Sequence, residues 1–447
     1  MILLLKISIP KYVEEALSSL EKCGFEAFVV GGALRDILLG SEPTDWDITT
    51  NALVDDLKNI FPKHFETGIA HGTLTVLVDK MPLEITTYRI DGDYVDNRRP
   101  ASVEFTNNLY EDLKRRDFTI NAIAYNPKSG IVDLFGGVED LQKGIIKCIG
   151  SADQRFNEDA LRILRGLRFS ATLNFDIESE TLSSISKNRN LLKNISAERI
   201  NVELTKLFLS DNRLEMLFDS GVGEVILPEV AKCFAVTQNN PHHIYDVGKH
   251  TLCAVINVPR TVALRFAALF HDVGKAKTKS TDKEGIDHFY GHNKVSEEIA
   301  REVLNRLKFD NKTKDRILKL VLLHDREILP TEKLVRRAVS KIGKEIFNDL
   351  LILKRADALA QNPEFTHEKL SYISHIEKIY KDILIQKHPL SLKDLEVNGA
   401  DMQKIGIFGK EIGDTLSLLL DKVLENPTIN VKKILIELAK EHKKAHN

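Results

Sequence analysis

The chain has 447 residues, of which 43% are hydrophobic, with 13 prolines, 24 glycines and no tract rich in proline, glycine or serine. At roughly 100 to 200 residues per domain, this length allows two to four globular domains, which excludes a small binding module and a largely disordered chain. The 63 lysines and arginines against 65 aspartates and glutamates give a formal net charge of −2. This balance excludes a polycation that coats nucleic acid indiscriminately, and it allows a nucleic-acid partner only where positive charge is clustered.

The cysteines and the N-terminal sequence indicate the cellular compartment of the protein. The four cysteines lie far apart and form no CxxC pair, so neither a disulfide framework nor a metal–thiolate site is expected. The apolar run at residues 2–5 is short and Pro10 follows it closely, which does not fit a signal peptide. We therefore expect a cytoplasmic protein without a membrane partner.

The first 150 residues alternate short β-rich runs with helical stretches, which predicts a mixed α/β head. We expect a strand at 25–30, a helix at 33–39, a strand at 45–50, and a hairpin of two strands at 73–78 and 83–88.

From Asn157 onward the apolar residues recur every three or four positions, as in Leu161, Leu164 and Leu167, which predicts helices to the C-terminus. The expected fold class is therefore α+β. We place a head at 1–150, a helical neck at 151–240, a helical body at 241–385 and a helical tail at 386–447. The joints are expected at 151–156, 237–241 and 386–391, where polar or proline-containing stretches interrupt the period.

The densest chemistry of the head lies between residues 29 and 50. Gly31 and Gly32 stand between the first strand and the helix, where missing side chains let backbone N–H groups approach a phosphate, and Arg35 follows one turn later. Asp45 and Asp47 are two residues apart on an expected strand, so both carboxylates project from one face and suit a pair of Mg²⁺ ions. An Asp-x-Asp pair alone is also typical of a solvated turn or a helix cap. Glu84 on the hairpin is either a third ligand or an edge-strand charge.

These motifs make the head resemble a known family. The segment 29–50 is similar to the head of the class II tRNA nucleotidyltransferases and the related bacterial poly(A) polymerases, members of the DNA polymerase β-like nucleotidyltransferase superfamily. Later motifs of that family follow in order: RRDFTINA at 115–122, DLFGG at 133–137 with Asp140-Leu141 after it, and EDALRILRGLRF at 158–169. The resemblance covers roughly residues 25 to 170 and implies a polymerase β-like nucleotidyltransferase head.

Asp159, Arg162, Arg165 and Arg168 are spaced to share one face of a helix that begins near Asn157, a good N-cap. The pattern alone also fits a solvated face with an Asp–Arg pair. The resemblance implies that Asp159 and Arg162 present a Watson–Crick-like edge that accepts CTP and ATP without a template.

The resemblance also implies roles for other residues of the head. Arg116 would contact the triphosphate, Asn121 would orient the sugar or a loop, and Arg165 and Arg168 would face the triphosphate or support the motif. The charged stretch 89–100 is expected to be a mobile loop, similar to the flexible loop of members that add all of CCA.

The helical body carries an ordered set of histidines and aspartates that resembles the HD phosphohydrolase superfamily. His250, His271, Asp272 and Asp357 match its core pattern, which implies a site for Ni²⁺, Mn²⁺, Fe²⁺ or Zn²⁺, and His292 and His324 would add a second metal position. Each histidine taken singly also fits a core or surface residue. The domain is either an active phosphohydrolase or a helical scaffold.

Three basic clusters provide local positive charge in the helical part. They are Lys312, Lys314, Arg316 and Lys319; Arg336, Arg337, Lys341 and Lys344; and Lys432, Lys433, Lys440, Lys443 and Lys444. Each fits a solvated helix face, or a surface that follows the phosphates of tRNA.

The sequence therefore predicts template-independent addition of CCA to the tRNA 3′ end, with tRNA, CTP and ATP as partners and Mg²⁺ as cofactor. Two alternatives stay open: a poly(A) polymerase or a partial CC- or A-adding enzyme, and a metal-dependent phosphohydrolase whose head only binds RNA. The oligomeric state is not indicated.

Overall fold

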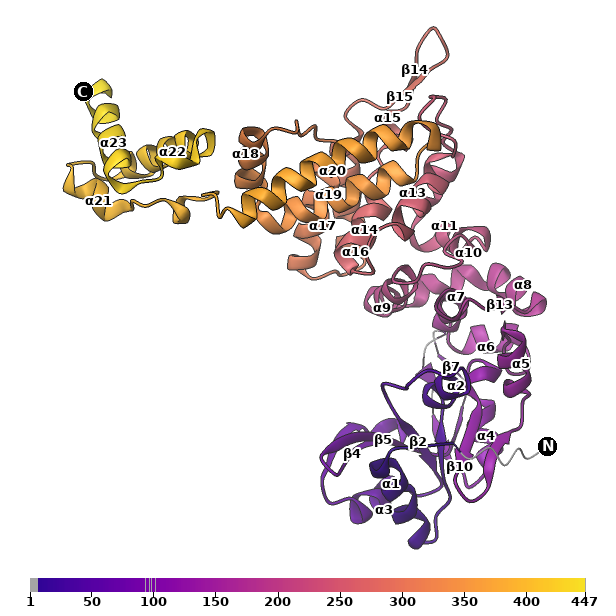
Figure 1. Ribbon diagram of the computed structural model, residues 1–447. Helices are drawn as coiled ribbons and strands as arrows, with labels where there is room; N and C mark the ends of the chain where they lie inside the picture. The colour runs from indigo at the N-terminus through magenta and orange to yellow at the C-terminus, as the bar shows by residue number, and fades with distance from the viewer. Residues whose placement is uncertain (1–6, 93, 96, 98, 101, 447) are drawn as a thin grey trace. The chain divides into compact units, whose positions relative to one another are not determined.

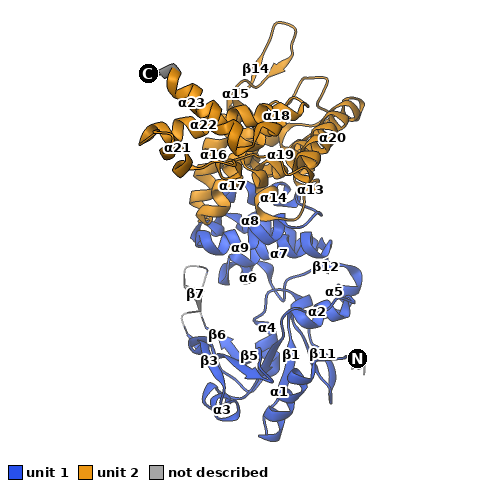
Figure 2. Ribbon diagram, turned by 60° about the vertical axis from the view of Figure 1, so that its left-hand side comes forward, with its two compact units in different colours: residues 1–228 blue, residues 229–447 orange. Residues whose placement is uncertain are grey.

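The computed structural model describes residues 7–92, 94–95, 97, 99–100 and 102–446 (Figure 1). The chain divides into two compact units, Met1–Pro228 and Glu229–Asn447 (Figure 2), and each is described by itself. The apolar run at 2–5 and residues Asp93, Asp96 and Arg98 of the expected loop lie outside the described residues. No helix in the described part of the chain is long and apolar enough to span a membrane.

Unit 1 is built on a seven-stranded mixed sheet with the order β11-β10-β1-β2-β5-β4-β3. The strands are β1 (Ala27–Val30), β2 (Asp47–Thr50), β3 (His64–Gly68), β4 (Thr73–Val78), β5 (Met81–Thr87), β10 (Ile123–Asn126) and β11 (Gly130–Asp133). Among the described strands of this sheet, only β2 and β5 pair in parallel, with Asp47 opposite Glu84. The strands expected at 25–30 and 45–50 and the hairpin are confirmed, with ends that differ by a few residues.

Five helices accompany this sheet: α1 (Lys11–Lys22), α2 (Gly32–Leu38), α3 (Val54–Ile60), α4 (Leu109–Lys114) and α5 (Gly137–Lys143). Helix α1 packs against β1 and β4, and α2 packs against β1 and β10. Val30 of β1, Ala124 of β10 and Leu113 of α4 form a buried cluster on this side of the sheet. Val30 is paired with Asp47, so the end of β1 and the start of β2 lie at the same edge of the sheet.

The stretch 89–100 is more ordered in backbone pairing than the loop that its composition predicts. Strand β6 (Arg89–Asp91) pairs with β9 (Val103–Phe105), and β7 (Tyr94–Val95) pairs with β8 (Arg99–Pro100). A charged segment lacks an apolar face for burial, but its backbone N–H and C=O groups can still form a ladder. Composition therefore did not reveal these strands.

The neck of unit 1 is helical, with α6 (Ala152–Glu158), α7 (Leu161–Leu173), α8 (Ser179–Asn188), α9 (Ala197–Phe208), α10 (Met216–Asp219) and α11 (Val222–Ile226). The helix start expected at Asn157 is wrong. Ser151 caps α6 by accepting the N–H of Gln154, so residues 152–156 are helical and not an interruption. The helix instead breaks at Asp159, whose backbone is extended and whose Oδ1 accepts the N–H of Leu161 at 3.1 Å. Asp159 therefore lies between α6 and α7.

Unit 2 begins with helices that pack around a common core. These are α13 (Val247–Ile256), α14 (Val262–Phe270), α15 (Lys275–Thr278), α16 (His292–Arg306), α17 (Asn311–Leu323), α18 (Glu332–Ile342), α19 (Lys344–Leu359) and α20 (Pro363–Ile385). A short hairpin of β14 (Ser280–Thr281) and β15 (Asp287–His288) projects between α15 and α16 (Figure 1). Residues 237–241 and 386–391 are not helical, as expected.

The tail consists of α21 (Gly399–Lys404), α22 (Lys410–Glu425) and α23 (Lys432–His446) around a small core that includes Met402, Leu419 and Leu435. Arg336 of α18 is 3% exposed and donates to the carbonyls of Leu424 and Glu425 at the end of α22. It therefore attaches the tail to the body and does not offer surface charge for RNA, contrary to its place in a basic cluster.

Candidate active site and metal centre

One cavity of about 580 Å³ in unit 1 brings together the residues of the head that the sequence singled out. They are Gly31, Gly32, Arg35, Asp45, Asp47, Arg116, Asn121, Asp159, Arg162, Arg165 and Arg168. They come from β2, α2, α7 and the loops around them, so residues up to 137 positions apart in the chain, Gly31 to Arg168, share one wall.

The acidic side of the cavity is Asp45 and Asp47. Asp47 is the first residue of β2, and Asp45 stands two residues before the strand and not on it. Asp47 contacts solvent, yet its partial burial and the charges of Glu84 and Asp45 raise its pKa, although Arg116 opposes this shift. Like charges that disfavour one another's ionised form are the donor set that a divalent cation relieves. The two carboxylates, with Glu84 beside Asp47 on β5, therefore fit Mg²⁺.

The glycine turn lies against this acidic pair. Gly31 has φ 78° and ψ −139°, a conformation that side-chain-bearing residues rarely adopt. A Cβ at Gly31 would stand 3.6 Å from Asp47 Oδ2 and 3.5 Å from an Arg116 nitrogen. The missing side chain thus keeps space open between the carboxylate and the guanidinium.

The basic side of the cavity is held by buried carboxylates. Asp112 is fully buried and binds Arg115 at 2.7 Å and Arg116 at 3.5 Å. Asp117 accepts from Arg165 at 2.6 Å and from the Asn121 amide at 3.0 Å. Burial raises the pKa of Asp117, but Arg165 and Asn121 outweigh it and hold that pKa below its ordinary value. Arg115, Arg116 and Arg165 therefore each contact a buried carboxylate and also line the cavity.

The Asn121 side chain links Asp117 to Arg35, because its amide donates to Asp117 and its Oδ1 accepts from Arg35 at 2.9 Å. Arg35, Arg165 and Arg168 also lie over the ring of Phe169, with Arg168 closest at 3.8 Å. Three guanidinium groups around one aromatic ring form a concentrated positive surface for a polyanion.

Asp159 and Arg162, which the resemblance led us to expect as base-selecting residues, differ from the expected arrangement. Asp159 pairs with Arg199 of α9 at 2.8 Å, and Arg162 binds Glu158 at 2.6 Å and the Arg115 carbonyl at 2.8 Å. Asp159 and Arg162 therefore do not share one continuous helix face, because Asp159 is at the break before α7. Both still line the cavity.

Sequence reasoning missed a set of residues on α9. Arg199 and Lys206 line the cavity, and Glu203 is 5% exposed and binds Arg168 at 2.5 Å. Their spacing of four and three residues puts them on one helix face, which is the signal that was available. A helix face with two cations and one acid is common on surfaces, so only the fold identifies this one.

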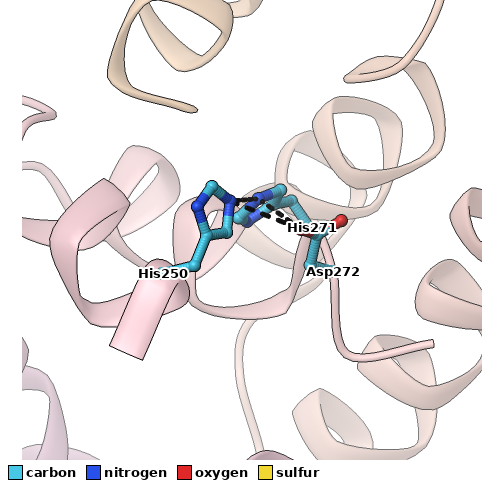
Figure 3. Close-up of side chains that lie close together, drawn as sticks. All are labelled: His250, His271 and Asp272. Atoms are coloured by element: carbon cyan, nitrogen blue, oxygen red, sulfur yellow. Dashed lines mark hydrogen bonds and ion pairs between the residues drawn. The ribbon is translucent and has the colours of Figure 1, made fainter. Parts of the chain in front are cut away.

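The second centre lies in unit 2, where six histidine and aspartate side chains converge. Asp272 is 2% exposed and stands between two histidine pairs. Its Oδ2 is 3.4 Å from His250 Nε2 and 3.3 Å from His271 Nε2 (Figure 3). Its Oδ1 is 3.2 Å from His292 Nε2 and 3.6 Å from His324 Nε2. Asp357 Oδ1 completes the first group, at 3.0 Å from His250 Nε2.

The imidazoles of this centre are oriented by the backbone. Nδ1 of His271, His292 and His324 donates to the carbonyl three residues earlier, at 2.7, 2.8 and 2.7 Å. Nδ1 of His250 lies 3.2 Å from the Ala360 carbonyl. Donation from Nδ1 leaves the lone pair on Nε2, and all four Nε2 atoms point at Asp272. The donor set fits two divalent metals that share the Asp272 carboxylate.

A cavity of about 480 Å³ opens beside this centre, and Asp357 forms part of its wall. Lys354, Lys369, Phe365 and Tyr372 also line it. Gln361 connects wall and centre, because it donates to Asp357 at 3.2 Å and accepts from Lys369. The volume suits a small phosphorylated molecule.

Comparisons with known proteins find matches along the parts of the chain that contain both sites. Family models match in three places: "Poly A polymerase head domain" at 27–147, "Probable RNA and SrmB- binding site of polymerase A" at 174–234, and "HD domain" at 242–362. The CCA-adding enzyme of Ligilactobacillus salivarius (strain UCC118) is 35% identical over 443 residues, which are 97% of each chain.

Two solved structures are similar along almost the whole chain. The Bacillus stearothermophilus CCA-adding enzyme in complex with CTP is 27% identical, with a TM-score of 0.71 over 98% of this chain and 99% of that one. The Thermotoga maritima CCA-adding enzyme complexed with tRNA is 22% identical, with a TM-score of 0.61 over 98% and 97%, a likeness of fold. On the identity shared from end to end with its curated relative, the chain belongs to the family of CCA-adding enzymes.

Proposed function

We propose that this chain adds C, C and A to the 3′ end of tRNA from CTP and ATP, without a template and with release of pyrophosphate. The observation that carries the proposal is one cavity of unit 1, in which an acidic pair and several arginines line the same space. The full-length similarity to CCA-adding enzymes, one of them solved with CTP, supports the same activity.

In this proposal Asp45 and Asp47 hold Mg²⁺, with Glu84 as a neighbouring carboxylate. When bound there, Mg²⁺ supplies the Lewis-acid chemistry of phosphoryl transfer, in which the tRNA 3′ hydroxyl attacks the α-phosphate and pyrophosphate leaves. The chain's own contribution is to bind and orient the triphosphate. Arg35, Arg116 and Arg165 are preorganised for this by Asn121, Asp112 and Asp117.

Asp159 is proposed to recognise the base, because a carboxylate accepts from the exocyclic amine that cytosine and adenine have and uracil and guanine lack at that edge. Arg162, which lines the same cavity, is the proposed donor to the ring. The pairing of Asp159 with Arg199 and its contact to the Leu161 amide would fix the carboxylate before a nucleotide arrives.

One assay separates this activity from its nearest alternatives. The protein is incubated with Mg²⁺, labelled CTP or ATP, and tRNA ending before CCA, after C, or after CC. We expect each substrate to be extended to CCA and no further. Long A tails would instead identify a poly(A) polymerase, and products that stop after CC would identify a partial enzyme.

The centre in unit 2 favours a second activity, a metal-dependent phosphohydrolase. His250, His271, Asp272 and Asp357 would hold one ion of the Ni²⁺, Mn²⁺, Fe²⁺ or Zn²⁺ type, and His292 and His324 with Asp272 a second. A bound ion supplies Lewis-acid activation of the ester. In the reaction water adds across the P–O ester bond, so its oxygen stays on phosphate and a proton goes to the leaving hydroxyl. The supporting observation is that Asp357, one of the proposed ligands, lines the neighbouring cavity. A domain that served only as a scaffold would not need a ligand exposed to a cavity.

Phosphate release tests this second activity. The full chain with Asp47→Asn, which lacks the head's proposed metal ligand, is loaded with Mn²⁺ and given small phosphate esters. We expect release of inorganic phosphate, and its loss in a further His271→Gln variant. Equal release with and without His271 would indicate a contaminant, and no release with full metal content would identify a scaffold.

Domain organisation and compartment are part of the proposal. The divisions proposed at 150/151 and 240/241 are supported by the extents of the three family matches, although the compact units divide after Pro228. The division proposed at 385/386 lies beyond these matches, which end at 362. A cytoplasmic location is supported by the four cysteines, which are all free.

A further inference from the structure

Two aromatic side chains, His288 and Tyr290, pack against each other at the end of the β14–β15 hairpin of unit 2. The Tyr290 side chain is 79% exposed, and its ring lies parallel to the His288 ring, at 7° and 5.3 Å between centroids. His288 is held from its other nitrogen by Asp282, with Nε2 to Oδ2 at 2.8 Å. The Tyr290 hydroxyl lies 3.4 Å from His288 Nδ1. An aromatic face that is exposed, flat and backed by a second ring is thus presented to solvent.

The hairpin that carries this pair is fixed in place. Asp282 accepts the N–H groups of Glu284 and Ile286, both at 2.9 Å, which closes the turn. Asp287 binds Lys279 at 2.8 Å and accepts the Asn239 N–H at 2.8 Å. Because these contacts order the rings beforehand, a molecule that stacks on them loses less conformational entropy on binding.

The aromatic pair is continuous with the metal centre. Tyr290 precedes the proposed ligand His292 by two residues, so their Cα atoms are within about 7 Å. The residue before Tyr290 also contacts the centre: the Phe289 carbonyl accepts from His292 Nδ1 at 2.8 Å, and the Phe289 ring lies 5.2 Å from the Lys275 ammonium. Lys275 in turn binds Asp272 Oδ2 at 2.7 Å. The segment that carries Tyr290 is therefore also a wall of the centre.

We propose that the Tyr290–His288 pair is a stacking surface for the base of a nucleotide whose phosphate ester reaches the unit 2 centre. This inference rests on the proposed phosphohydrolase function, and it defines the substrate class as nucleobase-bearing phosphates. An aromatic face stacks on any base and gains little from a bare sugar phosphate or inorganic phosphate. The exposed Lys277 and Lys283, on α15 and in the hairpin turn, add positive charge for a polyphosphate or an RNA backbone.

Fluorescence tests the stacking surface without relying on turnover. Trp46 is the chain's single tryptophan, so Tyr290→Trp in a Trp46→Phe background puts the only indole at this place. We expect AMP to quench its emission saturably and ribose 5-phosphate, which lacks the base, to leave it unchanged. The matched control is Ile385→Trp in the same background. Ile385 is 77% exposed but ends α20, about 33 Å from the start of that helix at Pro363. No quenching by AMP, or the same quenching at both positions, would overturn the inference.

Turnover gives the second readout. In the Mn²⁺-loaded enzyme we expect kcat/KM for AMP to exceed that for ribose 5-phosphate, and Tyr290→Ala to lower the AMP value roughly 5- to 100-fold while sparing ribose 5-phosphate. Tyr290→Phe, which keeps the ring, should restore the preference. Equal values for both esters in the unaltered protein would refute the inference and leave the phosphohydrolase standing. If neither ester is hydrolysed, the phosphohydrolase fails, and the quenching experiment still decides the stacking surface.

The source of the base is distinguished in the same assays. AMP and a short single-stranded RNA with a 3′-phosphate are titrated against the Tyr290→Trp reporter. Quenching by either supports the inference, and the ligand with the lower Kd identifies a free nucleotide or an RNA end as the source. Quenching by neither refutes it.

Discussion

The cavity of unit 1 and the histidine–aspartate centre of unit 2 both contain clustered carboxylates, but they are assembled in different ways. The unit 1 cavity draws its arginines from several elements and orients them through side chains such as Asp112, Asp117 and Asn121. In the unit 2 centre, three of the four histidines are oriented by a carbonyl three residues earlier, in contacts local to one turn. The first site depends on tertiary packing, and the second depends mainly on where helices begin and end.

This difference has a functional meaning. The function proposed for unit 1 requires binding of a triphosphate, a base and an RNA end, which needs a wide cavity lined by side chains from several elements. A site that holds two metal ions needs short, fixed distances between its ligands. Changes at ligands should therefore act on one centre only, and changes at supporting side chains should be felt mainly in unit 1.

The largest expected effect is the loss of nucleotide addition in Asp47→Asn. The substitution keeps the shape of the side chain and removes the charge that holds Mg²⁺, so incorporation should fall by about 10³-fold or more while tRNA binding is largely kept. Incorporation is measured by product length on tRNA lacking CCA, and binding by filter retention. Asp55→Asn, an exposed acid on α3, is the matched control. Addition near the normal rate in Asp47→Asn would remove the carboxylate pair from the mechanism.

Removing one imidazole should weaken metal binding at the unit 2 centre and leave nucleotide addition by the head unchanged. His292→Gln is expected to weaken metal binding by 10- to 100-fold, with CCA addition within about twofold of normal. Metal content after dialysis is measured by atomic emission, together with incorporation. His367→Gln, an exposed histidine on α20, should retain all its metal. Equal metal content in the two variants would contradict the assignment of His292.

The buried carboxylates that contact the arginines of the cavity should contribute to the free energy of unfolding of unit 1. Asp117→Asn removes the closer of the two carboxylates at Arg165 and leaves only Glu203, at 3.8 Å, so unfolding should become easier by about 3 kcal/mol at neutral pH. The folded pKa of Asp117 lies below its ordinary 3.8, so its contribution is present above pH 3.8 and is lost as the pH falls further. The difference between the two proteins should therefore be constant from pH 5 to 8 and shrink below pH 4.

Urea unfolding followed by Trp46 fluorescence reports on unit 1 and measures this difference. Glu139→Gln is the control, because it breaks an exposed pair with Lys143 on α5 and should leave the midpoint nearly unchanged. A difference that persists undiminished at pH 3 would mean that the Asp117 charge is not the cause.

The contrast between the sites also explains how much the sequence could predict. The hairpin β4–β5 was predictable because its apolar residues alternate along the sequence with period two. The six residues of the unit 2 centre were predictable because their types and order match the pattern of the HD superfamily. The helix break at Asp159 could not be predicted from the sequence, because Ser151 and Asn157 are equally good N-cap residues and only packing decides between them. Arg199 and Glu203 were missed for the same reason, since their partners Asp159 and Arg168 are 40 and 35 residues away.

The smallest expected effect concerns nucleotide choice, where the supporting contact and the recognising group can be separated. Asp159→Ala removes the acceptor and should relax selection of CTP and ATP over UTP and GTP by about 10- to 100-fold, the discrimination that one good base contact provides. Arg199→Ala should relax it less, since the carboxylate remains but loses the guanidinium at 2.8 Å, and Arg199→Lys should recover part of the loss. Selection is measured as the ratio of kcat/KM values on tRNA ending before CCA. If Arg199→Ala lowers kcat for every nucleotide equally and leaves the ratios intact, then Arg199 supports the fold of the neck and not the choice of base, and nucleotide choice in unit 1 would depend on local contacts as the metal centre does.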